Sequence, residues 1–158
     1  MKSRSTAISD FEFHDAVFTL ADLCGGDLVV HATELNIHRS APQNDRPTDM
    51  ELSLAHITFH DFRAASFEPG RVWKRDALGH SYPVGPQIIY EGAQADERLL
   101  HELRNPMTVY EFVQEDGLLR IDGCGDEPWF TAQFACSDVT IEWDDCRRPA
   151  WYVSKRKE

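Results

Sequence analysis

Apolar and polar residues alternate along much of this chain with a period of two. In residues 138–144 (DVTIEWD), Val139, Ile141 and Trp143 are separated by polar residues, and residues 129–136 (WFTAQFAC) repeat the pattern. Successive side chains of a β-strand point to opposite faces of a sheet, so this period predicts strands with one face in a core and one in water.

Two pairs of alternating segments are joined by short turn sequences. The glycines of LCGGD separate residues 13–22 from 28–38, and EDG separates 107–114 from 118–123. Glycine adopts the positive φ angles of tight turns without strain, so both pairs are predicted hairpins. Further strands are expected in 50–62 and 87–91, and Pro42 and Pro47 mark a loop over 39–48.

One segment has helical spacing. In residues 93–106, Leu99, Leu100 and Leu103 share a face and Pro106 ends the pattern. About eight or nine strands follow one another without intervening helices, which predicts an all-β fold with one short helix, an antiparallel β-sandwich or partly open barrel. The length indicates a single domain over 1–158, with an ordered core at about 11–152 and a flexible basic C-terminal tail.

The charge is strongly acidic and unevenly distributed. The net charge is −11, and residues 147–158 hold five basic and one acidic residue, so residues 1–146 carry −15. Such a surface repels phosphate backbones, which argues against nucleic acid as a partner. No run of about 20 apolar residues and no leader-like segment occur, so no membrane association is expected. Four cysteines without paired spacing predict reduced, mostly core thiols and a cytoplasmic protein.

No established catalytic motif is present. His56 and His60 stand four residues apart, but in a strand that separation is about 13 Å, too far for one metal ion. Cys124 has carboxylates beside it, which disfavour a reactive thiolate. We therefore predict no catalytic residue, no metal ligand and no cofactor, although residues brought together by the fold leave an enzyme open.

A basic, aromatic segment interrupts the acidic chain at residues 70–86 (GRVWKRDALGHSYPVGP). It is long for a strand connection, and long loops are often functional. Alternatively, the basic residues pair with the chain's own carboxylates and Trp73 caps the core, or RVWKR is a short strand with Val72 inward and the basic residues outward. Aromatic and arginine side chains dominate many interfaces. The candidate binding residues are Arg71, Trp73, Lys74, Arg75, His80, Tyr82 and Trp129.

The segments FEPGRVWKRDALGHSYPVGPQIIYEG and IDGCGDEPWF resemble a family of small bacterial cytosolic domains, and the resemblance covers most of residues 11–152. No activity is established for that family. The resemblance therefore implies a compact bacterial domain and transfers no catalytic residue to this chain.

Three classes of function fit these observations. The favoured one is a non-enzymatic binding or interaction protein, immunity-type or regulatory, whose acidic surface attracts a basic partner protein. The second is a small-ligand or carbohydrate-binding module in which Trp73, Tyr82 and Trp129 stack on sugar faces and Arg71 holds a carboxylate. The third is a hydrolase or metal-dependent enzyme. The oligomeric state is not determined by the sequence.

Overall fold

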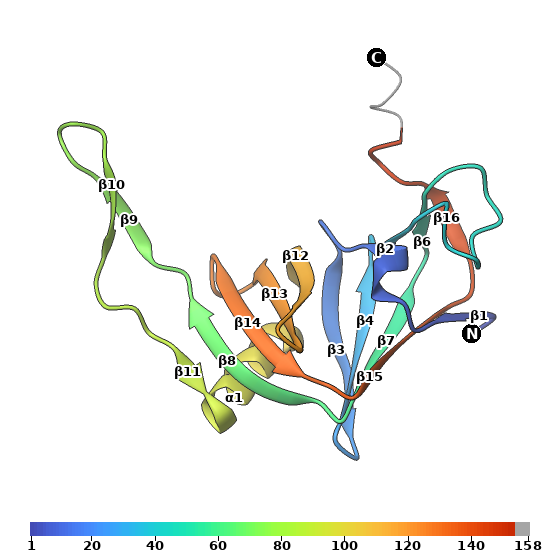
Figure 1. Cartoon of the computed structure of the whole chain (residues 1–158), viewed down its shortest axis with the longest axis horizontal. Helices are drawn as coiled ribbons and strands as arrows, with labels where there is room; N and C mark the ends of the chain where they lie inside the picture. Colours follow the sequence, from blue (N-terminus) through green and yellow to red (C-terminus); the bar gives the residue numbers. More distant parts are fainter. Residues whose placement is uncertain (154–158) are drawn as a thin grey trace.

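The computed structural model describes residues 1–153, and its main element is a ten-stranded antiparallel sheet (Figure 1). The predicted all-β architecture with one short helix is confirmed. The two outer strands, β1 and β11, are not paired with each other within the described residues, so the sheet is open. In spatial order its strands are β1 (Ser3–Ser5), β15 (Asp138–Trp143), β7 (Ala55–His60), β4 (Asp27–Thr33), β3 (Val17–Cys24), β12 (Met107–Glu115), β13 (Leu118–Cys124), β14 (Phe130–Ala135), β8 (Arg63–Pro69) and β11 (Tyr90–Glu91).

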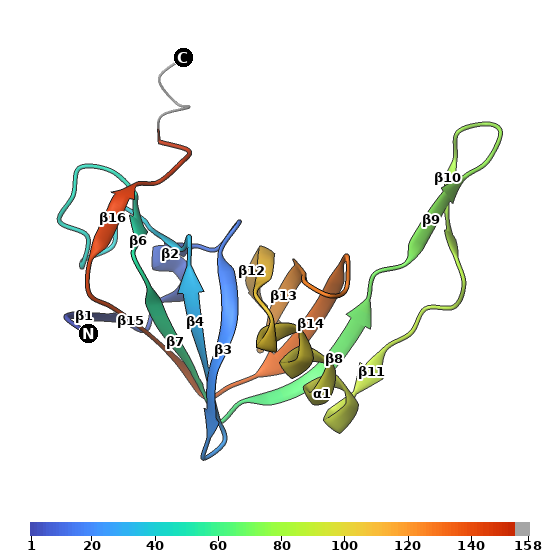
Figure 2. The same ribbon diagram turned by 180° about the vertical axis from the view of Figure 1, so that it is seen from behind.

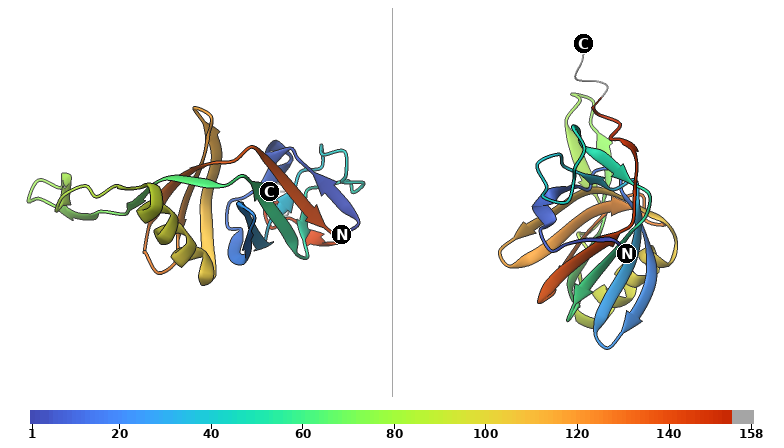
Figure 3. Two further views of the ribbon diagram at one scale, coloured as in Figure 1. Left: turned by 90° about the horizontal axis from the view of Figure 1, so that it is seen from below. Right: turned by 90° about the vertical axis from the view of Figure 1, so that its right-hand side faces the viewer.

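The sheet bends sharply at one corner, where the chain passes twice between the two halves, from β7 into β8 and from β14 into β15. β7 pairs with β15, and directly beyond the corner β8 pairs with β14. Asp61 turns the chain between β7 and β8 with a φ of 52°, and the Ser137 N–H donates to the His60 carbonyl at 2.8 Å. The first half, β1 to β3, therefore faces the second half, β12 to β11, as Figure 3 shows from two further sides.

Phenylalanine side chains fill the space between the two halves. The ring centroid of Phe59 on β7 lies 6.1 Å from that of Phe112 on β12 and 5.1 Å from that of Phe134 on β14. These rings are buried, and aromatic pairs at such separations stabilise a core beyond the area they remove from water. The inner-facing residues predicted from the alternation of β14 and β15 are buried here. Thr140, on the opposite face of β15, is buried as well.

Both predicted hairpins are present. Gly25 and Gly26, with φ angles of 63° and 91°, form the two-residue turn between β3 and β4. Asp116 and Gly117, with φ angles of 50° and 78°, do the same between β12 and β13. Two positive φ angles suit the twist of the flanking strands, which is why glycine and aspartate occupy these turns.

A second, four-stranded sheet corrects one expectation. Residues 50–62, predicted as one strand, divide into β6 in the small sheet and β7 in the large one, with a break at Ser53–Leu54. The predicted loop over 39–48 is a loop. The small sheet has the order β16 (Cys146–Pro149), β6 (Met50–Leu52), β5 (Asn36–Ile37) and β2 (Phe11–Glu12), and a short 3-10 turn, η1 (Ile8–Asp10), precedes β2.

The helix α1 (Gly92–Arg104) matches the predicted segment and packs against β8, β11 and β3 (Figure 2). Leu99, Leu100 and Leu103 are buried on its inner face. Glu102 is buried as well, at 2% exposure, which a helical pattern of leucines does not predict.

The chain termini and cysteines differ in part from expectation. Ser3–Ser5 form β1, upstream of the expected ordered core, and the tail residues 154–158 lie outside the described residues. All four cysteines are free thiols. Cys24 is exposed and the other three are half-buried, so the prediction that they are core residues is wrong for Cys24.

Candidate functional site

Residues 71–89, here called the arm, leave the large sheet after β8 and project away from the rest of the protein (Figures 1 and 2). Within the arm, β9 (Val72–Arg75) pairs with β10 (Ser81–Val84). The Asp76 Oδ1 atom accepts hydrogen bonds from the backbone N–H groups of Leu78 and His80, both at 2.9 Å, and so closes the tip. The segment predicted as a long loop is therefore a hairpin.

The described residues leave most of the arm uncovered. Trp73 is 60% exposed and Val72 is 65% exposed, so a core Trp73 and an inward Val72 are both wrong, whereas the short strand expected as one alternative is present as β9. Only Tyr90–Glu91 of the strand predicted over 87–91 pairs with β8. The large apolar side chains exposed in the arm are Val72, Trp73, Leu78, Tyr82, Val84, Ile88 and Ile89, seven of the eleven exposed in the described chain.

The register of the arm separates the candidate binding residues. Trp73 is opposite Pro83, and Lys74 is opposite Tyr82. Directly opposed residues share a face and neighbours in a strand do not, so Trp73 and Tyr82 lie on different faces. The seven candidates therefore form no single surface: Arg71, Trp73 and Trp129 line one hollow of about 210 Å³, and the others lie elsewhere on the arm.

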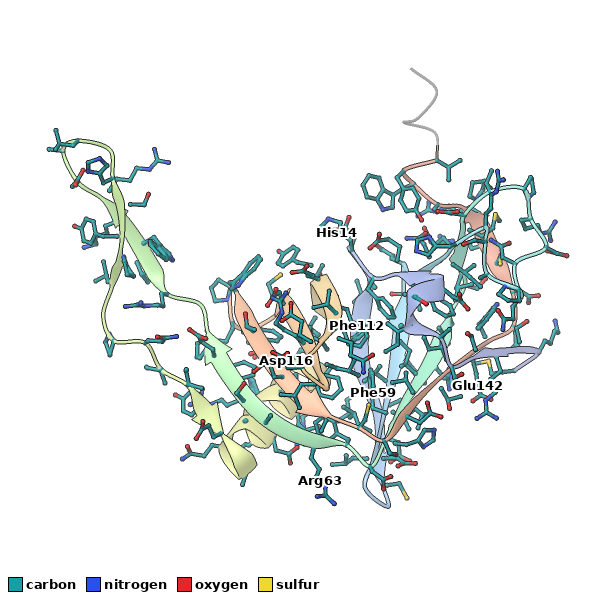
Figure 4. The ribbon with its side chains drawn as sticks, in the orientation of Figure 1. His14, Phe59, Arg63, Phe112, Asp116 and Glu142 are labelled. Carbon is teal, nitrogen blue, oxygen red and sulfur yellow. The ribbon has the colours of Figure 1, made fainter. Side chains whose placement is uncertain are left out.

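A larger depression lies beside the root of the arm. It has a volume of about 600 Å³ and is called the groove. Figure 4 labels His14 above Phe59 and Phe112, on the side of the sheet where the groove's lining residues lie. Its lining residues are Phe11, Glu12, Phe13, His14, Tyr110, Glu111, Phe112, Val113, Asp122 and Trp129.

Tyr110 and Trp129 form an aromatic platform in the groove. Their rings are stacked, with centroids 4.9 Å apart and 10° between the planes, and Trp129 remains 47% exposed. Tyr110 occupies a bulge in β12: Val109 pairs with Gly123 and Glu111 with Asp122, so Tyr110 has no partner in β13. Such a bulge redirects a side chain out of the regular alternation, which accounts for Tyr110 reaching Trp129.

Two polar contacts hold Tyr110 in place. Its hydroxyl lies 3.0 Å from the Cys124 sulfur, and this hydrogen bond raises the pKa of Tyr110. Its carbonyl accepts a hydrogen bond of 2.8 Å from the His14 ring. The structure thus gives Cys124 a supporting contact with Tyr110. Neither Gly123 nor Gly125 has a positive φ, and their missing side chains allow close packing against Thr108 and Glu102.

The groove continues into neighbouring hollows. At one end it shares Trp129 with the hollow beneath Trp73. At the other it shares Glu12 and His14 with a hollow of about 410 Å³ that Trp151, Tyr152, His38 and Asp49 also line. Together they form an extended concave surface from the arm to the small sheet.

This surface is acidic. Glu12, Glu111 and Asp122 line the groove, and Asp49 lines the hollow beyond it. Burial alone would raise the pKa of Asp49, but hydrogen bonds from the Arg39 N–H, Tyr152 and His38 lower it. Arg120 is the nearby cation, and its guanidinium pairs with Asp122, Glu111 and Glu115. Arg120 is thereby neutralised, and the carboxylates are in excess.

A buried carboxylate anchors the loop that carries Trp129. The Glu102 side chain accepts hydrogen bonds from the backbone N–H groups of Asp126 (2.8 Å) and Glu127 (3.2 Å). Burial raises the pKa of Glu102, these two N–H groups lower it, and the net shift is upward. Gly70 fixes the loop from the other side, because its N–H donates to the Trp129 carbonyl at 2.6 Å.

A second polar cluster lies on the outer face of the large sheet, away from the groove. His60 Nδ1 is 3.0 Å from Asp27 Oδ2, and His60 Nε2 is 3.0 Å from Thr140 Oγ1. The order of groups matches that of a hydrolase triad, but Thr140 is 4% exposed and its hydroxyl also accepts a bond from Arg4. A substrate does not reach a hydroxyl enclosed in this way, so the cluster joins strands β4, β7 and β15.

Of the residues predicted from sequence, the groove and the hollow beside it contain Arg71, Trp73 and Trp129. Lys74, Arg75, His80 and Tyr82 lie on the arm. Sequence reasoning missed Tyr110, Glu12, His14 and Asp122, because they become neighbours only through the bulge in β12 and the bend of the sheet. Nothing in the alternating residues 107–114 signals that Tyr110 leaves the pattern.

No helix in the described part of the chain is long and apolar enough to cross a membrane. Comparison of the chain with protein-family models, with curated proteins and with solved structures finds no match in any of the three.

Proposed function

We propose that the protein is a non-enzymatic interaction module of the bacterial cytoplasm, and that the groove receives a segment of a partner protein. The observation that carries this proposal is the Trp129 ring, which is stacked on Tyr110 yet 47% exposed in a depression of about 600 Å³. Four free thiols support a reducing compartment. Immunity-type or regulatory action follows from the acidic charge and remains a prediction.

The chemistry of the groove suits a protein segment. Tryptophan and tyrosine are the residue types that most often dominate interface energies, and a ring fixed by stacking loses little freedom on binding. The surrounding carboxylates select for basic or hydrogen-bond-donating groups and steer them by charge. The concave surface extends over three connected hollows, which suits an extended chain better than a compact metabolite.

The test is capture of partners from the source cell with the tagged full chain and two variants. Trp129→Ala removes the platform, and Leu23→Ala removes a similarly exposed apolar side chain (48%) in the β3–β4 hairpin. Proteins retained by the wild type and Leu23→Ala, but lost with Trp129→Ala, support the proposal. An identical set of retained proteins for all three chains contradicts it. Circular dichroism melts establish that both variants are folded.

A carbohydrate or small ligand is the second candidate. The observation that favours it is the flat Trp129 ring beside the acceptor groups of Glu12 and Glu111, an arrangement that suits the apolar face and hydroxyls of a sugar. A platform of Trp73, Tyr82 and Trp129 is not formed, because Trp73 and Tyr82 lie on different faces of the arm. The test is to add neutral oligosaccharides to the protein and follow the NMR signal of the Trp129 indole. A saturable shift of that signal supports a carbohydrate ligand, and the absence of any shift contradicts it.

A further inference from the structure

We infer that the arm of one chain docks in the groove of a second copy, so that two chains exchange arms in a reciprocal dimer. This inference rests on the proposed function, because it assigns the groove's protein partner. It also gives a role to residues 71–89, the largest group of exposed apolar side chains in the described structure.

The arm lacks a packing partner within its own chain. All four residues of β9 are exposed, and so are three of the four residues of β10. A two-stranded hairpin alone is marginally stable in water, and an exposed apolar surface of this kind marks an interaction site. A hairpin with uncovered apolar side chains on both faces therefore indicates a partner that covers it.

Charge identifies the groove as the matching surface. The arm holds Arg71, Lys74 and Arg75 against the single carboxylate Asp76, which is +3 − 1 = +2. The net charge of the chain is −11, so all other residues together carry −11 − 2 = −13. The groove and its neighbouring hollow contain the carboxylates of Glu12, Glu111, Asp122 and Asp49. Glu111 and Asp122 share the single Arg120 guanidinium, so negative charge remains in excess.

The same charges argue against the simplest alternative, in which two arms pair with each other. Arm-to-arm contact would bring Lys74 and Arg75 of each chain together, with only Asp76 of each arm to offset them. Pro83 also removes an N–H donor from β10, and a proline in an outer strand opposes edge-to-edge pairing. Docking through side chains into an acidic, aromatic depression avoids both penalties.

The position of the arm suits reciprocal exchange. Its root lies against the groove, since Gly70 bonds to Trp129, while its tip points away from its own sheet (Figure 1). A two-fold axis that crosses the two arms midway between root and tip brings each tip to the groove beside the other chain's root. Such a pair buries two identical arm–groove contacts and closes the assembly at two chains.

The first measurement is the molar mass of the full chain by light scattering over a range of concentrations. The buffer contains sodium chloride at 0.1 M or above. At this concentration the Debye length is about 10 Å or less, so the salt screens the long-range repulsion between two acidic chains. The expected result is a concentration-dependent rise from 18.1 kDa to twice that mass. A single mass of 18.1 kDa at every concentration, or open-ended assemblies larger than a dimer, overturns the inference.

Variants then locate the contact. The arm variant carries Leu78→Ser and Tyr82→Ala, both at exposed positions, and the groove variant carries Trp129→Ala. Each is expected to weaken self-association at least tenfold, since truncation of an interface anchor typically costs that much. Glu12→Lys is a second groove variant that keeps the aromatic platform and repels the arm. Leu23→Ala, outside both surfaces, is expected to dimerise as the wild type does.

Mixing the two defective chains gives the decisive result. The arm of the groove variant is intact, and so is the groove of the arm variant, so a mixed dimer recovers one complete contact. Stronger association in the mixture than in either variant alone supports arm–groove exchange. Equal weakness in the mixture overturns it and indicates arm–arm or groove–groove contact instead. A monomeric chain that still captures other proteins through Trp129 overturns only this inference and leaves the proposed function standing.

Discussion

The ring of Trp129 lies nearly parallel to that of Tyr110 at a centroid distance of 4.9 Å. Tyr110 is within β12, whereas Trp129 is in the loop before β14, 19 positions further along the chain. Three features create this pair: the bulge at Tyr110, the Glu102 side chain that holds the loop before Trp129, and Gly70, which allows the root of the arm to approach. The stacking of Trp129 on Tyr110 therefore depends on the bulge, on the Glu102 anchor and on the root of the arm together.

Two tryptophans provide a direct test of the exposure of the arm. Trp73→Ala is expected to change the free energy of unfolding by no more than about 0.5 kcal/mol, because an exposed side chain contributes little to the core. Trp143→Ala, at 2% exposure, is expected to cost roughly 3–5 kcal/mol. Urea titrations measure both. A fall in midpoint for Trp73→Ala as large as that for Trp143→Ala would show that the arm is part of the scaffold.

Gly70 is predicted to control the position of Trp129. An alanine Cβ there would lie 2.7 Å from the Trp129 carbonyl oxygen and 2.9 Å from its Cβ, so the loop or the arm has to move. Gly70→Ala is expected to shift the Trp129 indole signal in a ¹⁵N–¹H spectrum and leave that of Trp143 in place. Gln87→Ala, which removes the neighbouring bond to Glu68, is the control. An unchanged Trp129 signal in Gly70→Ala contradicts this account of the root.

Glu102 makes part of the stability depend on pH. Since burial raises the pKa of Glu102, the folded protein holds that proton more tightly than the unfolded chain does. Its contribution to stability is therefore greatest at acid pH and falls as the pH rises through the raised pKa. The free energy of unfolding of the wild type relative to Glu102→Gln is expected to decrease from below the ordinary glutamate pKa of 4.5 to neutral pH.

Urea titrations across this pH range measure the difference, with Glu97→Gln on the same helix as the matched control. A difference between wild type and Glu102→Gln that stays constant or increases with pH contradicts the assignment.

The cysteines are expected to react in a fixed order. Cys24 is exposed, whereas burial raises the pKa of Cys136 and of Cys146, which keeps them as unreactive thiols. Mass spectrometry during alkylation of the folded protein should find Cys24 modified first. Thiol titration of the unfolded protein without reductant should find four. Fewer than four thiols, or slower modification at Cys24 than at Cys146, contradicts the described state.

Local signals in the sequence predicted much of the fold. The alternation in β14 and β15, the glycine turns after Cys24 and Glu115, and the leucine spacing of α1 each depend on residues within a few positions of one another. These local signals did not predict the places where the chain passes from one sheet to another without a turn residue in the sequence. Residues 50–62 read as one strand because apolar residues continue through Ser53, where the chain passes from the small sheet to the large one.

The candidate site was predicted only in part, for the same physical reason. The unusual composition of residues 70–86 identified the arm, and an exposed Trp73 was one of the two alternatives. Its hairpin structure depends on cross-strand pairs such as Trp73 with Pro83, which composition does not specify. Convergence of Tyr110, Glu12 and Trp129 requires a bulge and a bent sheet, and neither has a signature in a single sequence.

The most direct measurement of the central claim, that the groove binds a protein segment, is photo-crosslinking in the source cell. A benzophenone amino acid replaces Val113, which lines the groove, in one chain and Leu23 in the other, so that Trp129 is kept in both. We expect a discrete protein adduct from position 113 and none from position 23, and an adduct of twice 18.1 kDa would identify a second copy as the partner. Absence of any protein adduct at position 113, with the chain expressed and folded, would contradict the claim.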